Sequence, residues 1–299
     1  MDARFSVLLS GRGWAVVDKS GNIPCHPSGR YRRNTLETLL REAGFPEVHF
    51  ATRLDRETSG CTLVATDAAA AGALGRALQS RRVRKTYLCF ARGQWRETPG
   101  PDGFCAVRGW ICPAGDETVR KYRKFVRGDP VSPPPLPPGA QEAATRFRVV
   151  PWRSLGLPDA GAALAEAAGF LALECVPETG RTHQIRATVR ALGLEVVGDK
   201  LYGPDRSIYA RMCEDAMLPE DRERLGMARQ ALHAWKIAFR EPRPEQDRAA
   251  AEVEAVSPPG GMLRDFAAML SRWRRAGRFR ESPARRPAES TCSRTASSV

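Results

Sequence analysis

Short apolar runs separated by turn-forming residues predict a set of β-strands along the chain. Residues 85–91 alternate between polar and apolar side chains, as a half-buried strand does, whereas 61–65 is a continuous run typical of a buried strand. The other segments with a strand pattern are 13–18, 145–150, 170–176 and 232–239.

Four segments carry helical patterns. Residues 35–43 end at a glycine, and Asp67 is a suitable N-cap for an Ala/Leu-rich helix that runs to about residue 81. In 182–192, apolar residues recur four and three positions apart before Gly193, which is typical of a helix with one buried face and a glycine stop. A last helix is expected over 262–275.

Two low-complexity segments lie between these elements. The proline-rich stretch 129–139 cannot join a helix or a sheet ladder, because its prolines lack N–H donors, so we expect a loop. The alanine-rich stretch 154–169 is typical of an inserted loop or a short helix. No βαβ repeat is sustained, and we therefore predict an α+β fold with a mainly antiparallel mixed sheet flanked by helices and loops. We expect a main domain over 1–245 and a helical extension with a disordered basic tail over 246–299.

The chain is strongly basic, with 47 lysines and arginines against 34 acids and a net charge of +13 over 299 residues. Such a balance favours a nucleic acid or another polyanion as partner, although charge for solubility alone is the alternative. Part of the excess is local, since residues 272–299 contain eight arginines and two glutamates.

The eight cysteines include no C-x-x-C pair, and the four histidines do not lie at zinc-ligand spacing to them. Cysteines inside apolar runs, such as Cys89, are typical of reduced core residues. We therefore expect no metal and a reducing intracellular compartment, with the cytoplasm favoured and the nucleus or an organelle left open. No run approaches 18 apolar residues, so we expect no membrane span.

The segment T-R-L-D-R-E-T-S-G at 52–60 carries the strongest chemical signal. Asp55 lies between Arg53 and Arg56, and flanking positive charge lowers a carboxylate pKa and favours an ionised nucleophile over a general acid. No second acid has an obvious claim to pair with Asp55. The alternative is a surface cluster of ion pairs ahead of a strand.

Two further residues are candidates. Tyr87 lies in a predicted strand, where it either packs in the core or offers a ring on which an extruded base stacks. Arg186 lies one turn before Arg190 on the helix predicted over 182–192, and it either pairs with a carboxylate or phosphate or belongs to a solvated face. His183 has no evident partner and is expected to be a hydrogen-bonded structural histidine. The connection 193–203 has no chemical interpretation of its own.

In order, the motifs R-L-D-R-E-T-S-G, R-K-T-Y, A-T-R-F, T-G-R-T-H-Q-I-R, V-G-D-K-L-Y-G and L-H-A-W resemble those of the RluA-type RNA pseudouridine synthases over about residues 12–240. The segment 19–36 most resembles members related to eukaryotic tRNA pseudouridine synthases. The resemblance implies that the main domain is a catalytic domain that isomerises a uridine within RNA, without cofactor or metal. We expect the protein to be a monomer. The RNA would be tRNA or rRNA, with tRNA favoured.

The resemblance also implies roles for individual residues. Asp55 matches the catalytic aspartate that attacks the flipped uridine, at the sugar or at the base. Tyr87 matches the tyrosine that packs on the target base, and Arg186 matches the basic residue paired with the aspartate. Arg53 matches an arginine that fills the gap left in the base stack in some members. Base extrusion is physically reasonable, because the reacting atoms cannot be reached inside a stacked helix.

The chain departs from the family pattern at a few positions. Thr52 replaces a frequent histidine, Ser20 follows Lys19 where proline is common, and Ala187 and Thr188 follow R-T-H-Q-I-R in place of valine and histidine. These departures bear on substrate contacts more than on activity. A catalytically silent RNA-binding or RNA-folding protein is the alternative function, while a base glycosylase would need a second acid to activate water, and none stands out.

Overall fold

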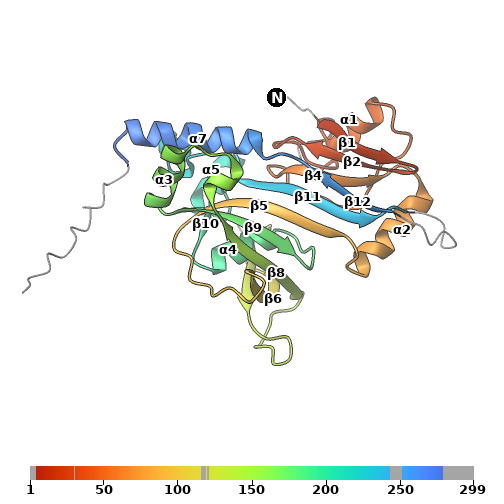
Figure 1. Ribbon diagram of the computed structural model, residues 1–299, viewed down its shortest axis with the longest axis horizontal. Helices are drawn as coiled ribbons and strands as arrows, with labels where there is room; N and C mark the ends of the chain where they lie inside the picture. The colour runs from red at the N-terminus through yellow and green to blue at the C-terminus, as the bar shows by residue number, and fades with distance from the viewer. Residues whose placement is uncertain (1–4, 30, 116–118, 120, 243–250, 279–299) are drawn as a thin grey trace, which may run out of the picture.

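The computed structural model describes residues 5–29, 31–115, 119, 121–242 and 251–278. Within these residues a single mixed sheet extends along the long axis of the molecule (Figure 1). The twelve strands are β1 (Phe5–Gly11), β2 (Trp14–Lys19), β3 (His49–Phe50), β4 (Ser59–Ala65), β5 (Arg84–Arg92), β6 (Cys105–Pro113), β7 (Arg123–Arg127), β8 (Gln141–Val150), β9 (Phe170–Pro177), β10 (Glu195–Val196), β11 (Leu232–Arg240) and β12 (Glu252–Val256).

The strand order is β1-β2-β4-β11-β5-β9-β8-β6-β7, and the short strands β3, β10 and β12 pair with β4, β5 and β11. Among the described strands, β4 and β11 form the one parallel pair, and every other pairing is antiparallel. The predicted α+β class with a mainly antiparallel sheet is therefore confirmed.

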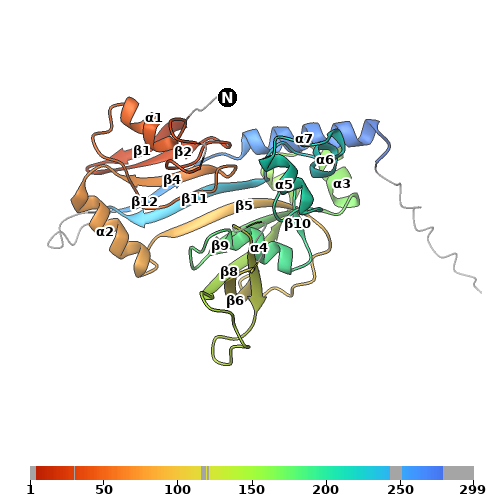
Figure 2. The same cartoon turned by 180° about the vertical axis from the view of Figure 1, so that it is seen from behind.

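Helices lie on the faces and at the ends of this sheet (Figure 2). They are α1 (Leu36–Glu42), α2 (Ala68–Gln79), a 3-10 turn at Trp152–Leu155, α3 (Asp159–Ala167), α4 (Gln184–Ala191), α5 (Ser207–Cys213), α6 (Pro219–Leu225) and α7 (Gly260–Arg275). The four predicted helices are present, and the side chain of Asp67 accepts the Ala70 N–H at 2.7 Å, so the predicted N-cap is confirmed. The proline-rich stretch 129–139 contains no helix or strand, and the alanine-rich stretch forms α3.

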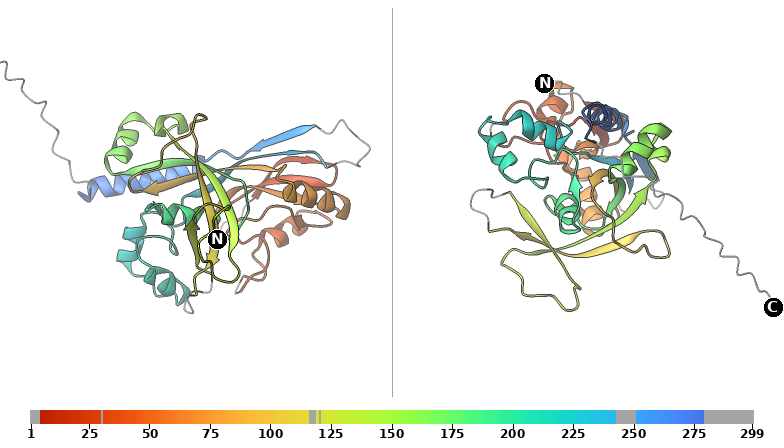
Figure 3. Two further views of the ribbon diagram at one scale, coloured as in Figure 1. Left: turned by 90° about the horizontal axis from the view of Figure 1, so that it is seen from below. Right: turned by 90° about the vertical axis from the view of Figure 1, so that its left-hand side faces the viewer.

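The strands β6, β7 and β8 extend away from the rest of the sheet as an arm (Figures 1 and 3). The helix α4 packs against β6, β7 and β9, in the angle between this arm and the main sheet. Six consecutive residues of α4, 184–189, are buried. The sequence predicted a helix with one buried face. The structure buries more of α4 than that, because sheet strands cover this helix on more than one side.

The start of α4 also differs from the prediction, which placed it at residue 182. The helix begins at Gln184, whose side chain accepts the Thr179 hydroxyl at 2.8 Å and the Arg181 N–H at 2.9 Å. These bonds hold residues 179–183 in a turn, and the helix follows only after His183. A side chain that reaches back to the backbone competes with helix at such a position.

The C-terminal elements pack on the same sheet. The strand β12 pairs with β11, and Phe266 of α7 stacks on Trp152 with ring centroids 4.6 Å apart. The expected division at residue 245 falls within 243–250, outside the described residues, and stays a prediction. The expected disordered tail lies outside them from residue 279 onward.

Gly60 allows β4 and β11 to lie side by side. Its φ is +107°, and a Cβ atom there would lie 2.2 Å from the carbonyl oxygen of Ala234. Other residues rarely adopt this φ, and none has room for its side chain. Gly60 therefore lies inside β4, where it sets the start of the parallel pair a few residues after Asp55.

Candidate active site

Asp55 lies in a loop between β3 and β4 that is fixed from both sides. The Leu54 N–H donates to the Cys25 thiol sulfur at 3.3 Å, and the Thr58 N–H donates to the Asp55 carbonyl at 3.1 Å. Upstream, the Thr52 hydroxyl accepts the Leu63 N–H at 2.9 Å, so Thr52 has a structural bond here. The loop is therefore held to the sheet before and after the aspartate.

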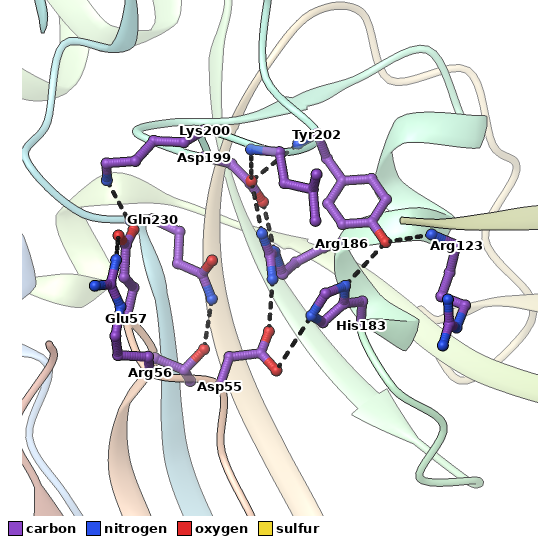
Figure 4. Close-up of polar contacts among 12 residues, drawn as sticks. Asp55, Arg56, Glu57, Arg123, His183, Arg186, Asp199, Lys200, Tyr202 and Gln230 are labelled. Carbon is purple, nitrogen blue, oxygen red and sulfur yellow. Dashed lines mark hydrogen bonds and ion pairs between the residues drawn. The ribbon is translucent and has the colours of Figure 1, made fainter. Parts of the chain in front are cut away.

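Arg186 joins Asp55 to a second, fully buried aspartate (Figure 4). Its Nη1 donates to Asp55 Oδ2 at 2.8 Å, while Nε and Nη2 donate to the two oxygens of Asp199 at 2.6 and 2.8 Å. The Arg186 side chain is 8% exposed, so a solvated helix face is excluded for this residue, whereas Asp55 is 29% exposed. A ligand can thus reach Asp55 but not the arginine behind it.

The pKa values follow from this geometry. Burial alone raises the pKa of Asp55, but the Arg186 guanidinium and hydrogen bonds from Arg186 and Gln230 bring the pKa below its ordinary value. Burial likewise opposes the charge of Arg186, yet Asp199 and Asp55 raise its pKa. The site therefore presents an ionised carboxylate at neutral pH.

Tyr87 lies in the middle of β5 and packs on two of the core clusters, so its ring is half-buried. Burial raises the pKa of its hydroxyl, and the Asp55 carboxylate raises it further. The phenol therefore stays neutral, within electrostatic reach of Asp55. Core packing is observed for Tyr87, and its expected contact with the target base stays a prediction.

Arg53 is not among the residues whose contacts to the Asp55 carboxylate are described. Its side chain is exposed on the loop, two residues before Asp55, while the contacts to the carboxylate come from Arg186 and His183. The structure thus brings Asp55 and Arg186 into contact, adds Tyr87 through its electrostatic influence, and leaves Arg53 at the solvent side.

The connection 193–203 supplies residues that the sequence analysis did not assign. Asp199 accepts the N–H groups of Leu201 and Tyr202 at 2.9 and 3.0 Å, which fixes its carboxylate toward Arg186. Next to it, Lys200 donates to Glu57 at 2.8 Å and to the Ala228 carbonyl at 2.7 Å. The motif V-G-D-K-L-Y-G was the available signal, but an acid 13 residues after the arginine has no visible link to it before the chain folds.

His183 also has partners that the sequence did not reveal. Its Nδ1 lies 3.1 Å from the Tyr202 hydroxyl and its Nε2 lies 3.8 Å from Asp55 Oδ1. Tyr202 stacks on Tyr122 at a centroid distance of 4.8 Å, and the Arg186 guanidinium lies 4.9 Å from the Tyr202 centroid. The histidine expected to be structural is hydrogen-bonded, and it also borders the candidate nucleophile.

Lys19, at the end of β2, is a buried anchor beneath the site. Its Nζ donates to the carbonyls of Ser20, Ile23 and Arg56 at 2.9, 3.0 and 3.2 Å. Burial lowers its pKa to about 8, against partial compensation by nearby acidic groups including Asp55. The lysine joins β2 to the loop that carries the aspartate.

Six of the cysteines, Cys25, Cys61, Cys89, Cys105, Cys112 and Cys175, are buried thiols, and Cys213 is an exposed one. Within the described ranges no helix is long and apolar enough to cross a membrane.

Comparison with known proteins places the chain in a family. The family model described as RNA pseudouridylate synthase matches residues 13–191, more than half of the chain. The chain therefore belongs to this family, and the suspected resemblance is confirmed.

Two relatives illustrate the range of the family. A ribosomal large subunit pseudouridine synthase D from Xanthomonas campestris pv. campestris is 30% identical over 258 residues, covering 84% of this chain and 67% of the relative. A mitochondrial tRNA pseudouridine(32) synthase from Saccharomyces cerevisiae is 30% identical over 209 residues, covering 67% of this chain and 37% of the relative. The chain spans about half the length of the curated relatives it matches.

Among solved structures, human RNA pseudouridylate synthase domain containing 1 is similar, with a TM-score of 0.59 and 26% identity. The match covers 86% of this chain and 84% of the human one. The predicted pseudouridine synthase fold is therefore confirmed.

Proposed function

We propose that this protein converts specific uridines in structured RNA to pseudouridine, with Asp55 as the nucleophile. Membership of the family supports the reaction class. The observation that carries the assignment of Asp55 is its geometry: an ionised, partly exposed carboxylate with one oxygen held 2.8 Å from a buried arginine. A protein that only bound RNA would not need such a group.

The reaction moves one bond and leaves the atom count unchanged. Asp55 attacks the flipped uridine at the sugar or at the base, and the bond between N1 and C1′ breaks. The uracil turns, C5 forms a bond to C1′, and the bond between Asp55 and the substrate breaks, which returns the free carboxylate. C5 loses a proton while N1 gains one. Arg186 keeps Asp55 ionised for this attack, and because Asp199 balances its charge, Arg186 needs no further anion from the substrate.

Tyr87 and Arg53 have proposed roles on the substrate side. The neutral ring of Tyr87 packs on the target base, a contact worth about 1–3 kcal/mol for a stacked base. Arg53, exposed beside the carboxylate, fills the gap that the extruded nucleotide leaves.

The RNA that we favour is a tRNA over an rRNA. The segment 19–36, which resembles tRNA-modifying members, supports this choice, as do yeast relatives whose names state tRNA synthases. The relatives also include ribosomal enzymes, so the choice needs mapping of the product. We also propose that the protein acts as a monomer, because Asp55, Tyr87, Arg186 and Asp199 all come from one chain.

The proposed function is tested with RNA carrying tritium at uridine C5, because pseudouridine formation releases that hydrogen to water. Wild-type protein should release tritium from total tRNA, and Asp55→Asn should reduce the rate to below about a thousandth while RNA binding persists. Glu166→Gln, an exposed change on α3, is the matched control and should leave release unchanged. Equal release by wild type and Asp55→Asn would exclude the nucleophile, and RNA binding without release by wild type would favour the silent binder.

A further inference from the structure

His183 has an unusual backbone conformation at the start of α4. Its φ and ψ are 57° and 18°, in the left-handed region, where residues other than glycine are uncommon. Such a conformation costs free energy and persists where the surroundings determine it. In this case it directs a side chain that is 11% exposed toward the carboxylate of Asp55.

The hydrogen bonds of Tyr202 determine which nitrogen of His183 carries the proton. The Arg123 backbone N–H donates to the Tyr202 hydroxyl oxygen at 3.0 Å, and this bond has only one possible direction. The phenolic hydrogen is left to donate to His183 Nδ1 at 3.1 Å. If His183 Nδ1 carried the proton and donated it to Tyr202, the Tyr202 hydroxyl oxygen would accept two hydrogen bonds, from His183 and from Arg123. Its own hydrogen would then have neither residue as an acceptor. Nδ1 is therefore the acceptor, and Nε2 carries the proton.

The Nε2–H group faces the oxygen of Asp55 that Arg186 does not hold. Nε2 lies 3.8 Å from Oδ1, which is longer than a hydrogen bond, while Oδ2 is bound to the arginine at 2.8 Å. Burial lowers the pKa of His183 to about 4, although Asp55 opposes this shift, so the ring is neutral at neutral pH. A neutral N–H dipole orients Oδ1 without adding a second cation that would weaken the nucleophile.

We propose that His183 is a positioning residue for Asp55, fixed by Tyr202 as the Nε2–H tautomer so that its N–H restrains the rotation of the Asp55 carboxylate. This inference rests on the proposed function of Asp55 as nucleophile. The chain Arg123 N–H to Tyr202 to His183 to Asp55 starts at the first residue of β7, so the arm contributes to the geometry of the carboxylate. Small misplacements of a reacting group cost large factors in rate, which is why such a restraint matters.

The tautomer can be observed directly by two-bond ¹H–¹⁵N correlation of histidine-labelled protein at pH 7. His183 is identified by the signals lost in His183→Gln. We expect an unprotonated Nδ1 and a protonated Nε2, and an averaged pattern after Tyr202→Phe. His233 provides an internal reference, because its Nε2 lies 2.8 Å from the Ser257 carbonyl and must also carry the proton. An Nδ1–H tautomer or a charged ring would overturn the proposal.

Two substitutions separate positioning from backbone strain. Asparagine tolerates the left-handed region but has no donor near the place of Nε2, whereas glutamine places an amide there and fits that backbone less well. If His183 positions Asp55, His183→Gln keeps the single-turnover rate within about threefold and His183→Asn lowers it by about tenfold or more, with unchanged RNA affinity. A faster Asn variant would mean that only the backbone conformation matters, and would overturn the proposal.

The matched pair on the tyrosines completes the test. Tyr202→Phe removes the hydroxyl but keeps the stacked ring, and should lower the rate by about tenfold. Tyr122→Phe makes the same change in the ring stacked on it and should leave the rate unchanged. If Tyr202→Phe and Tyr122→Phe changed the rate equally, the proposed role of the Tyr202 hydroxyl in fixing His183 would be contradicted. The NMR result does not depend on catalysis, so it can fail while Asp55→Asn still abolishes activity, and the two proposals are thereby distinguished.

Discussion

At the scale of single residues, the site is organised around one arginine between two carboxylates of different exposure. Arg186 and Asp199 are buried together, and Asp199 accepts four hydrogen bonds, two from the Arg186 side chain and two from the backbone N–H groups of Leu201 and Tyr202. Asp55 projects toward solvent. Asp199 compensates the buried guanidinium, so the arginine can bind one oxygen of Asp55 and leave the other accessible. A buried ion pair of this kind is costly to break, because the remaining charge has no partner.

We predict that Asp199→Ala lowers the free energy of unfolding by about 3–5 kcal/mol and strongly reduces tritium release. Asp199→Asn should lower stability less, because its side-chain oxygen can still accept from the N–H groups of Leu201 and Tyr202. Stability is measured by urea unfolding and activity by single-turnover release.

The control is Asp221→Asn, since Asp221 is also buried and accepts two hydrogen bonds from one guanidinium, that of Arg211. The Asp221→Asn variant should lose a free energy of unfolding comparable to that lost by Asp199→Asn, and it should keep its activity. If both asparagine variants lost activity in proportion to stability, Asp199 would act only through folding.

At the scale of elements, Lys19 shows how a strand end supports the catalytic loop. Its buried ammonium donates to three carbonyls, two of them in the turn after β2 and one in the loop of Asp55. Burial disfavours the charged form of the lysine, and this lowers its pKa to about 8. The unfolded chain keeps an ordinary lysine with a pKa near 10.5.

We predict a pH-dependent effect of Lys19→Met. Between about pH 8 and 10.5 the unfolded wild type binds a proton at Lys19 that the folded protein does not, so its unfolding free energy rises with pH in this window. At pH 7 the variant should be less stable by about 1–3 kcal/mol, because one buried and two partly buried carbonyls lose their donor.

The stability difference between wild type and Lys19→Met should then grow from pH 8 to 10.5. Urea unfolding of the two proteins across this range measures it, and other groups that titrate cancel in the difference. A constant difference would mean that Lys19 keeps an ordinary pKa in the folded protein.

The elements that could be predicted are those whose apolar pattern or cap lies within their own segment of the sequence. The strand β4 and the helix α2 carry their own apolar pattern and cap, and both were predicted within a few residues. The strands β6 and β7 were not predicted, since arginines and glycines interrupt their apolar positions and only pairing with β8 and α4 buries them. The strand β1 was missed because most of its residues are exposed.

At the scale of the whole molecule, one sheet connects the N-terminal strands, the site and the C-terminal elements. The last helix packs into the core beside Trp152 and Phe170, so a truncation that tests the basic tail must fall after it. Beyond residue 278 the sequence carries four further arginines, Arg280, Arg285, Arg286 and Arg294, against two glutamates.

We predict that removing residues 279–299 weakens RNA binding and flattens its salt dependence. Four arginines that each neutralise a phosphate would contribute about 3 to the slope of log K against log salt. Thermal unfolding and the single-turnover rate at saturating RNA should be unchanged. The full-length protein with these arginines replaced by glutamine is the matched control, and an unchanged slope in both proteins would mean that the tail does not contact RNA.

The sequence alone determined the fold class, the main strands and helices, and the three residues Asp55, Tyr87 and Arg186 as candidates. It did so because alternation, caps and ordered motifs are local properties that need no folded partner. The tertiary structure alone decided that Asp199 compensates Arg186 and that His183 faces Asp55. These contacts join segments whose separations along the chain carry no periodic signal, and they arise only where the sheet, α4 and the connection after it pack together.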